Sequence, residues 1–140
     1  RGICTLRPGI VGVSDNITVR SIVGRFLEHH RLFYFRNGGN EKIFLSSADW
    51  MPRNLNERVE LMIPIEDKRH KARIKGILDL YLADTLKAHL MRADGSYYKV
   101  SNIEGPLSAQ EELMEAANTQ DSREQMTVIE RFKPMFKMKE

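Results

Sequence analysis

The sequence lacks several features that would assign it to a common functional class. Its 140 residues include one cysteine, Cys4, so no disulfide can form within the chain and a reducing compartment is indicated. No apolar run approaches the roughly 20 residues that a membrane-spanning helix requires. There is no internal repeat, no P-loop and no GxGxxG pattern. What remains is a globular chain with 41% hydrophobic residues, long enough for one domain with its own core, in which we expect Cys4 to be buried.

Excess positive charge is small overall but unevenly distributed. The net charge is +3, yet residues 1–36 carry six arginines, no lysine and two acidic residues, a balance of +4. The other 104 residues carry 16 of the 22 bases and 17 of the 19 acids. Arginine binds phosphate through two parallel hydrogen bonds, so this skew favours a polyanionic partner. On charge alone, a solvated basic face remains the better interpretation.

Residues 26–54 contain the strongest structural pattern in the chain. The apolar runs LFYF and KIFL predict a β-hairpin, and the turn at 37–40 (NGGN) supplies residues that tolerate positive φ. A hairpin brings its two outer ends together, so side chains just before the first strand meet those just after the second. We therefore expect a polar cluster of His29, His30, Arg31, Ser46 and Ser47, with Arg53 and Asn54 nearby after a short turn capped by Ser47 or Asp49.

This cluster has the chemistry that a phosphate group needs. Arginine supplies forked charged donors, and histidine titrates near neutral pH. His30 should face away from His29 if the strand has begun there. Trp50 is expected to be a core anchor rather than a platform for base stacking. Neither His70 nor His89 has partners at metal-ligand spacing, so we expect no metal site built by the chain itself.

The N-terminal half predicts further elements around this hairpin. Residues 1–6 resemble a short buried strand, and residues 7–16 a loop. An apolar stripe over 18–28 predicts a helix whose C-terminal end lies beside His29. Residues 58–65 (RVELMIPI) alternate incompletely, which predicts a central strand covered on both faces.

The C-terminal half gives clearer signals. Asp67 can cap a helix that runs to about residue 87, and ADGS at 93–96 predicts the turn of a second hairpin. Ser108 begins a capping box for a helix to about residue 118. The element order indicates an α/β or α+β domain over 1–118, with helices covering a mixed sheet. Residues 119–140 are expected to form a loosely held tail.

Four motifs together resemble a known family. RGICTLRPG, SIVGRFLEHHR, the aromatic strand with NGG, and SSADWMPRN follow one another in the order found in the C-terminal catalytic region of bacterial polyphosphate kinase. The resemblance runs from Arg1 to about Asn118 and implies the second of two phospholipase-D-like half-domains. It further implies an ATP–polyphosphate phosphotransferase that uses Mg²⁺, in which a histidine of the first half becomes phosphorylated. Nothing in this chain occupies that first half.

The resemblance also implies roles for individual residues. The histidine of the FLEHxR motif falls on His29, which would contact phosphate or act as an acid or base. The arginine that opens RGIC falls on Arg1, which would bind nucleotide phosphate. Paired carboxylates at metal spacing are not evident, so Mg²⁺ would arrive mainly with the phosphates. Further candidate phosphate ligands are Arg31, Ser46, Ser47, Arg53 and Asn54.

Two alternatives remain open at this stage. A phospholipase-D-like phosphodiesterase or nuclease would need an H-x-K motif followed by an aspartate, but Arg31 replaces the lysine and Arg36 and Asn37 occupy the region of the acid. A non-catalytic polyanion-binding module would need exposed aromatics among its basic residues. The expected partners are ATP or ADP, polyphosphate and the rest of a polyphosphate kinase chain in a homo-oligomer, and not nucleic acid. The expected location is cytoplasmic, either free or peripheral to the inner membrane.

Overall fold

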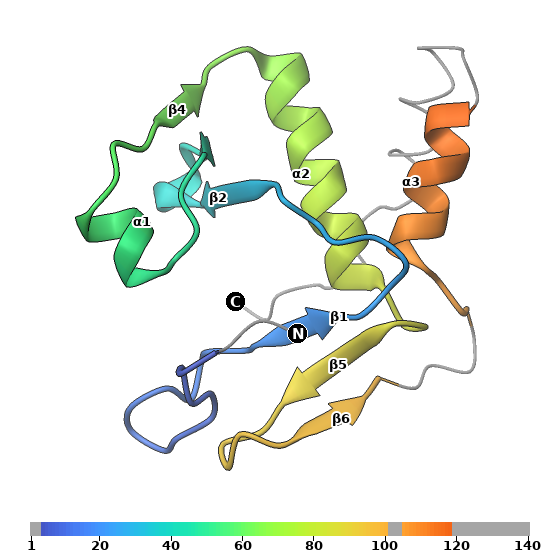
Figure 1. The fold of residues 1–140 in the computed structure, drawn as a ribbon. Helices are drawn as coiled ribbons and strands as arrows, with labels where there is room; N and C mark the ends of the chain where they lie inside the picture. The colour runs from blue at the N-terminus through green and yellow to red at the C-terminus, as the bar shows by residue number, and fades with distance from the viewer. Residues whose placement is uncertain (1–3, 101–104, 119–140) are drawn as a thin grey trace.

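The computed structural model describes residues 4–100 and 105–118 (Figure 1). Helices and strands alternate along this part of the chain. In order they are β1 (Arg20–Ile22), β2 (Arg31–Phe35), the 3-10 turn η1 (Asn37–Gly39), β3 (Lys42–Ser46), α1 (Pro52–Asn56), β4 (Met62–Ile65), α2 (Lys68–Ala83), β5 (Ala88–Met91), β6 (Tyr97–Lys99) and α3 (Ala109–Asn118).

The strands form two small antiparallel sheets. One has the order β1-β5-β6 and the other β2-β3-β4. Figure 1 shows the first sheet below, the second with α1 at upper left, and α2 and α3 at upper right. The α+β class is therefore confirmed, but the described residues form two antiparallel sheets in place of the single mixed sheet that we expected.

Both predicted hairpins are confirmed. In the β2–β3 hairpin Arg31 pairs with Ser46 and Tyr34 with Ile43. Its turn places Asn37, Gly38 and Gly39 at φ of 46°, 62° and 95°, whereas Asn40, expected to share this conformation, has φ of −94°. The β5–β6 hairpin turns through Gly95, with φ of 84°. Local sequence thus determines both turns, because glycine and asparagine adopt positive φ at low cost.

Strand β4 lies at an edge of its sheet, so the prediction of a central strand over 58–65 was wrong. Among the described residues its one partner strand is β3, and its Met62 and Ile63 are 55% and 52% exposed. The central strand is β3, whose Ile43 is 1% exposed. The position of Pro64 fits an edge, because proline lacks the N–H that a second neighbouring strand would need.

The helix predicted over 18–28 does not form. Arg20–Ile22 is strand β1 and pairs with β5. The β-branched residues Val19, Ile22 and Val23 favour a strand, and the partner strand decides between the two periodicities. His29 therefore follows a segment without helix or strand, which bends at 25–26, and lies at no helix end. Residues 4–6 also form no strand and Cys4 is exposed, which contradicts our expectation of a buried strand and a core cysteine there.

A buried carboxylate, Asp84, joins the elements at the end of α2. Its Oδ1 accepts from the backbone N–H groups of Lys87 and Ala88 at 2.7 and 3.0 Å, and its Oδ2 accepts from that of Ala109 at 2.8 Å. Its carbonyl oxygen accepts from Nη1 of Arg20 at 2.7 Å. Asp84, which has no solvent exposure, thereby links α2, β5, α3 and β1.

The two long helices begin where the sequence predicts. Oδ1 of Asp67 accepts from the N–H groups of Arg69 and His70, as expected for the cap of α2. The helix after Ser108 is also confirmed, although the Asp84 carboxylate bonds its first N–H group. Among the described residues, no helix is both long and apolar enough to span a membrane.

Much apolar surface remains exposed. Trp50 is 79% exposed and stacks on Phe33 with ring centroids 5.9 Å apart, so the prediction of a core anchor was wrong. Around α1 and β4 lie further exposed apolar residues, namely Met51, Leu55, Val59, Leu61, Met62 and Ile63. An apolar surface of this kind marks an interaction site in soluble proteins.

Candidate functional site

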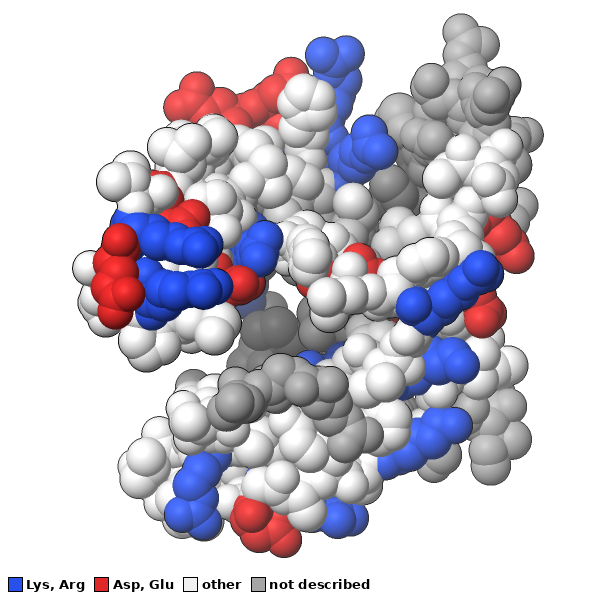
Figure 2. Space-filling view, in the orientation of Figure 1, with Lys and Arg blue, Asp and Glu red and all other residues white. Residues whose placement is uncertain are grey.

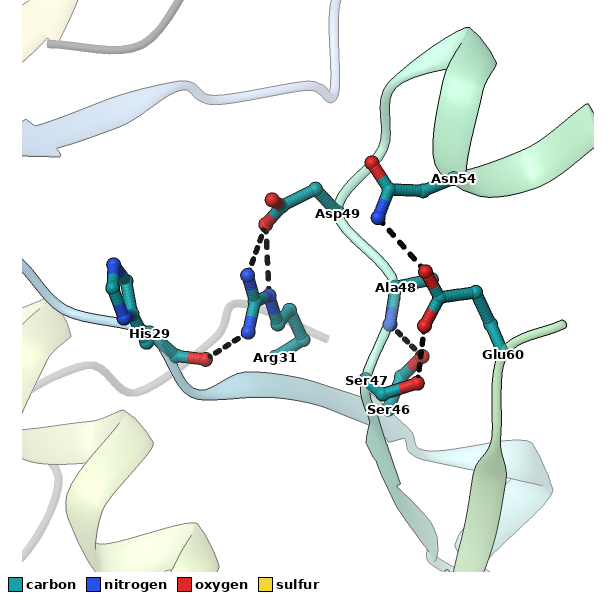
Figure 3. Close-up of polar contacts among 8 residues, drawn as sticks. All are labelled: His29, Arg31, Ser46, Ser47, Ala48, Asp49, Asn54 and Glu60. Atoms are coloured by element: carbon teal, nitrogen blue, oxygen red, sulfur yellow. Dashed lines mark hydrogen bonds and ion pairs between the residues drawn. The ribbon is translucent and has the colours of Figure 1, made fainter. Parts of the chain in front are cut away.

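Arg31, at the start of β2, is held on two sides (Figure 3). Its Nε and Nη2 both reach Oδ1 of Asp49, at 2.8 and 2.7 Å, and its Nη1 donates to the carbonyl oxygen of His29 at 2.6 Å. The side chain is 29% exposed. Its charge is therefore paired with Asp49, and its third nitrogen fixes the backbone of the histidine two residues earlier.

Ser46, the last residue of β3, and Ser47, the next residue, both form side-chain hydrogen bonds with the segments that follow. Oγ of Ser46 accepts from the N–H of Ala48 at 3.1 Å. Oγ of Ser47 donates to Glu60 and accepts from the N–H of Leu61 at 3.0 Å (Figure 3). The hairpin thus brings Ser46 opposite Arg31 as predicted, while Ser47 bonds across to the segment that precedes β4.

Glu60 is a member of the cluster that sequence reasoning missed. Its Oε1 accepts from Nδ2 of Asn54 at 2.9 Å, and its other oxygen accepts from Ser47. The Ser47 hydroxyl, and after it the Asn54 amide, hold the pKa of the Glu60 carboxyl below its usual range. In the sequence, the signal for a role of Glu60 is its position as an acidic residue between the apolar Val59 and Leu61.

Neither of the predicted short-turn caps forms. Met51 precedes α1 without a side-chain bond to the helix, and Asp49 pairs with Arg31 instead. Asn54 is 5% exposed, and its Oδ1 is buried with no hydrogen-bond partner in the described part of the chain. Arg53 is exposed on α1. Arg1 lies outside the described residues, so its predicted role has no structural account here.

His29 and His30 lie in different surroundings. An apolar groove of about 520 Å³ is lined by every second residue of the approach to β2, namely Phe26, Glu28, His30 and Leu32. The His30 ring also lies 5.2 Å from that of Tyr81. His29 is exposed and does not line the groove. The same is true of the residues two positions away, Leu27 and Arg31, in that neither lines the groove. The expected alternation at this pair is therefore seen.

The charge on this face is mixed. Figure 2 shows lysine and arginine side chains in several separate places, often beside acidic ones. Within 4–100 and 105–118, no group of three or more His, Cys, Asp or Glu residues is placed to hold a metal ion. Of the predicted ligands within these ranges, His29 and Arg53 are exposed and remain the local candidates for phosphate.

Comparison with known proteins identifies the family. Residues 1–110 match the model of the polyphosphate kinase C-terminal domain 2. The chain belongs to this family. The resemblance carried by the four motifs is thereby confirmed, including its extent over most of the chain.

Individual members of the polyphosphate kinase family are close in sequence and structure. The polyphosphate kinase of Pseudomonas aeruginosa is 55% identical over 117 residues, which cover 82% of this chain and 17% of the relative. That of Bacillus anthracis is 59% identical over 102 residues, covering 73% and 14%. The crystal structure of the Porphyromonas gingivalis polyphosphate kinase superimposes with a TM-score of 0.78 at 38% identity, covering 84% of this chain and 18% of that one. The chain thus spans less than a fifth of the length of these relatives.

Proposed function

We propose that this chain is part of an ATP–polyphosphate phosphotransferase. In this proposal the enzyme reversibly moves the terminal phosphate of ATP onto polyphosphate, through a phosphohistidine in a first half-site outside these residues. The relatives are named polyphosphate kinases, which supports the substrate class. The observation that carries the proposal is the exposed His29, whose backbone Arg31 fixes at 2.6 Å while Asp49 holds Arg31.

His29 would act on the transferred phosphoryl group or its leaving oxygen. Charge develops on that oxygen during transfer, and a positioned imidazole can donate a hydrogen bond or a proton to it. Arg31, already paired, would position His29 rather than bind phosphate itself. Arg1, by the family resemblance, and the exposed Arg53 would contact phosphate oxygens. Ser46, Ser47 and Asn54 would stabilise the turn that carries Asp49.

A Mg²⁺ ion is implied by the family activity, but the described residues do not form a suitable ligand set. The two carboxylates nearest the cluster are occupied, because Asp49 accepts from Arg31 and Glu60 accepts from Ser47 and Asn54. Magnesium usually combines one or two protein carboxylates with substrate phosphates. We therefore assign Mg²⁺ no ligand among the described residues, and propose that it arrives with the nucleotide and is bound mainly elsewhere in the enzyme.

The exposed apolar surface supports a role within a larger chain. Val59 is fully exposed and Leu61 is 65% exposed, just before β4, which is an edge strand of its sheet in the described part of the chain. Burial of such residues against the rest of a polyphosphate kinase would stabilise both parts. We further propose that the assembled enzyme is a cytoplasmic homo-oligomer whose ligands are ATP, ADP and polyphosphate.

The proposal is tested by two neighbouring substitutions in the full-length enzyme. His29→Ala should lower ATP-dependent polyphosphate synthesis by on the order of 10²–10³ in rate, as removal of a transition-state donor does. His30→Ala should cost much less, because its ring lies in the groove on the other side of the backbone. Circular dichroism should show both variants folded. Near-normal turnover in His29→Ala, or equal losses in both variants, would contradict the assignment.

A further inference from the structure

The side-chain amide of Gln110 pairs with the backbone that leads to His29. Gln110 lies in the first turn of α3 and is 6% exposed. Its Oε1 accepts from the N–H of Phe26 at 3.0 Å, and its Nε2 donates to the carbonyl of Phe26 at 2.8 Å. One amide thus satisfies both backbone groups of a residue 84 positions away, as a neighbouring strand would.

The same amide also holds the residue just before His29. Nε2 of Gln110 donates to Oε1 of Glu28 at 2.8 Å, and Oε2 of Glu28 lies 3.4 Å from Nδ1 of His30. The His30 ring in turn packs on Tyr81. Burial raises the pKa of the Tyr81 hydroxyl, and the nearby Glu28 charge adds to this, so Tyr81 stays neutral. Both neighbours of His29 are therefore anchored on the groove side.

A glycine leaves the room that this amide needs. A Cβ built on Gly24 would lie 2.2 Å from Oε1 and 2.6 Å from Cδ of Gln110. Its φ lies outside the left-handed region, so alanine would be compatible with the backbone itself. Alanine at this position would therefore displace the amide at the end of the Gln110 side chain.

His29 is consequently held from two directions. On the groove side, Gln110 fixes Phe26 and Glu28, and on the other side Arg31 donates to the carbonyl of His29. Hydrogen bonds to the Phe26 backbone, the Glu28 side chain and the His29 carbonyl limit the movement of the backbone that carries the His29 imidazole. A neutral amide suits this task, because it donates and accepts at once, which a carboxylate or an ammonium group does not.

We propose that Gln110 is a positioning residue that sets the placement of the His29 imidazole for phosphoryl transfer. The inference rests on the proposed function, since it assumes that His29 acts on the substrate. A misplacement of about 1 Å at a reacting group costs up to about 10²-fold in rate. Loss of the Gln110 amide should therefore lower kcat while KM for ATP changes little, because ground-state contacts remain.

The first arm of the test uses single variants of the full-length enzyme. Gln110→Ala should lower kcat by about 10- to 100-fold. Gln110→Glu should not restore it, because it loses the Nε2 donor and sets a second carboxylate against Glu28. Gly24→Ala should give a similar loss by displacing the amide. Glu111→Ala, the next and exposed position of α3, is the matched control and should keep wild-type kcat.

The second arm separates positioning from a merely structural role. If Gln110 acts through His29, Gln110→Ala should cost less than about 3-fold in a His29→Ala background, and Gly24→Ala should cost little in a Gln110→Ala background. An equal loss in both His29 backgrounds, wild-type kcat in Gln110→Ala, or loss of the fold in both Gln110→Ala and Gly24→Ala would overturn the inference. Near-normal turnover of His29→Ala alone would instead contradict the proposed function.

Discussion

Arg31 and His29 are joined by a hydrogen bond of 2.6 Å from Nη1 of the guanidinium to the histidine carbonyl. The bond holds the backbone two residues before the strand that carries Arg31, and Asp49 fixes the remaining nitrogens. Arginine can make this set of contacts because its guanidinium group is rigid and planar, and the N–H donors in that plane point in different directions. A lysine at position 31 would have a single ammonium group and could not reach both Asp49 and the His29 carbonyl in this way.

Arg31→Lys should therefore fail to replace arginine although it keeps the charge. We expect a loss of about 10- to 100-fold in kcat of the full-length enzyme, through displacement of His29, with a smaller change in KM for ATP. Steady-state kinetics check this result. Arg36→Ala removes a positive charge from the exposed end of the same hairpin and should leave kcat near wild type. A large rise in KM with unchanged kcat would instead identify Arg31 as a direct phosphate ligand.

The turn of the β2–β3 hairpin should depend on Gly39. This residue has φ of +95°, and a Cβ there would meet no atom within 4 Å, so any cost comes from the backbone conformation alone. Gly39→Ala should destabilise the chain by roughly 1 kcal/mol, and Gly39→Val by more. Urea unfolding gives the measurement. Gly105→Ala, at ordinary φ and in equally open space, should cost much less; equal midpoints for the two alanine variants would refute the turn.

The buried Asp84 should contribute more to the stability of the fold than an exposed aspartate such as Asp94 does. Asp84→Ala leaves the N–H groups of Ala88 and Ala109 buried without an acceptor. At about 1–3 kcal/mol for each such donor, we expect a loss of roughly 2–6 kcal/mol in the free energy of unfolding. Asp94→Ala removes an exposed carboxylate that accepts from Ser96 and should cost far less in the same urea titration. Similar losses would show that Asp84 does not join α2 to β5 and α3.

The stability of the site should fall in acid through Glu60. Its folded-state pKa is lowered from the ordinary 4.5, mainly by Ser47, so the carboxylate stabilises the fold above that value. This contribution is lost as the pH falls through the lowered pKa. Glu60→Gln should lower the thermal midpoint at pH 7, and its difference from the wild type should shrink towards pH 3. Glu57→Gln, at an exposed position on the same loop, should differ little from the wild type; a Glu60 effect that grows in acid would reverse the assigned direction.

Elements with local signals were predictable from the sequence. The NGGN and ADGS turns and the Asp67 cap depend on residues within a few positions of each other, so their predictions were confirmed. The stripe over 18–28 was equally local but misleading. Its β-branched residues suit either period, and pairing with β5, almost 70 residues away, selects the strand.

The long-range contacts of the site were not predictable. Arg31 was expected to bind phosphate, but the partner that engages it, Asp49, comes close only because the hairpin folds back. The role of Gln110 has no local signal, since nothing near it in sequence marks an amide that pairs with Phe26. The exposure of Trp50 was not predictable for a related reason. The sequence of this chain alone does not reveal which of its apolar residues would contact another part of a larger protein.

The alternation between Phe26 and Leu32 also constrains how this stretch can evolve. Residues 26, 28, 30 and 32 line the groove, and those between them do not. Insertion or deletion of a single residue would exchange the two sets, turning His29 into the apolar groove and Glu28 out of it. A substitution alters only one side chain at a time. A change in the number of residues in this segment should therefore disturb the site more than most single substitutions would.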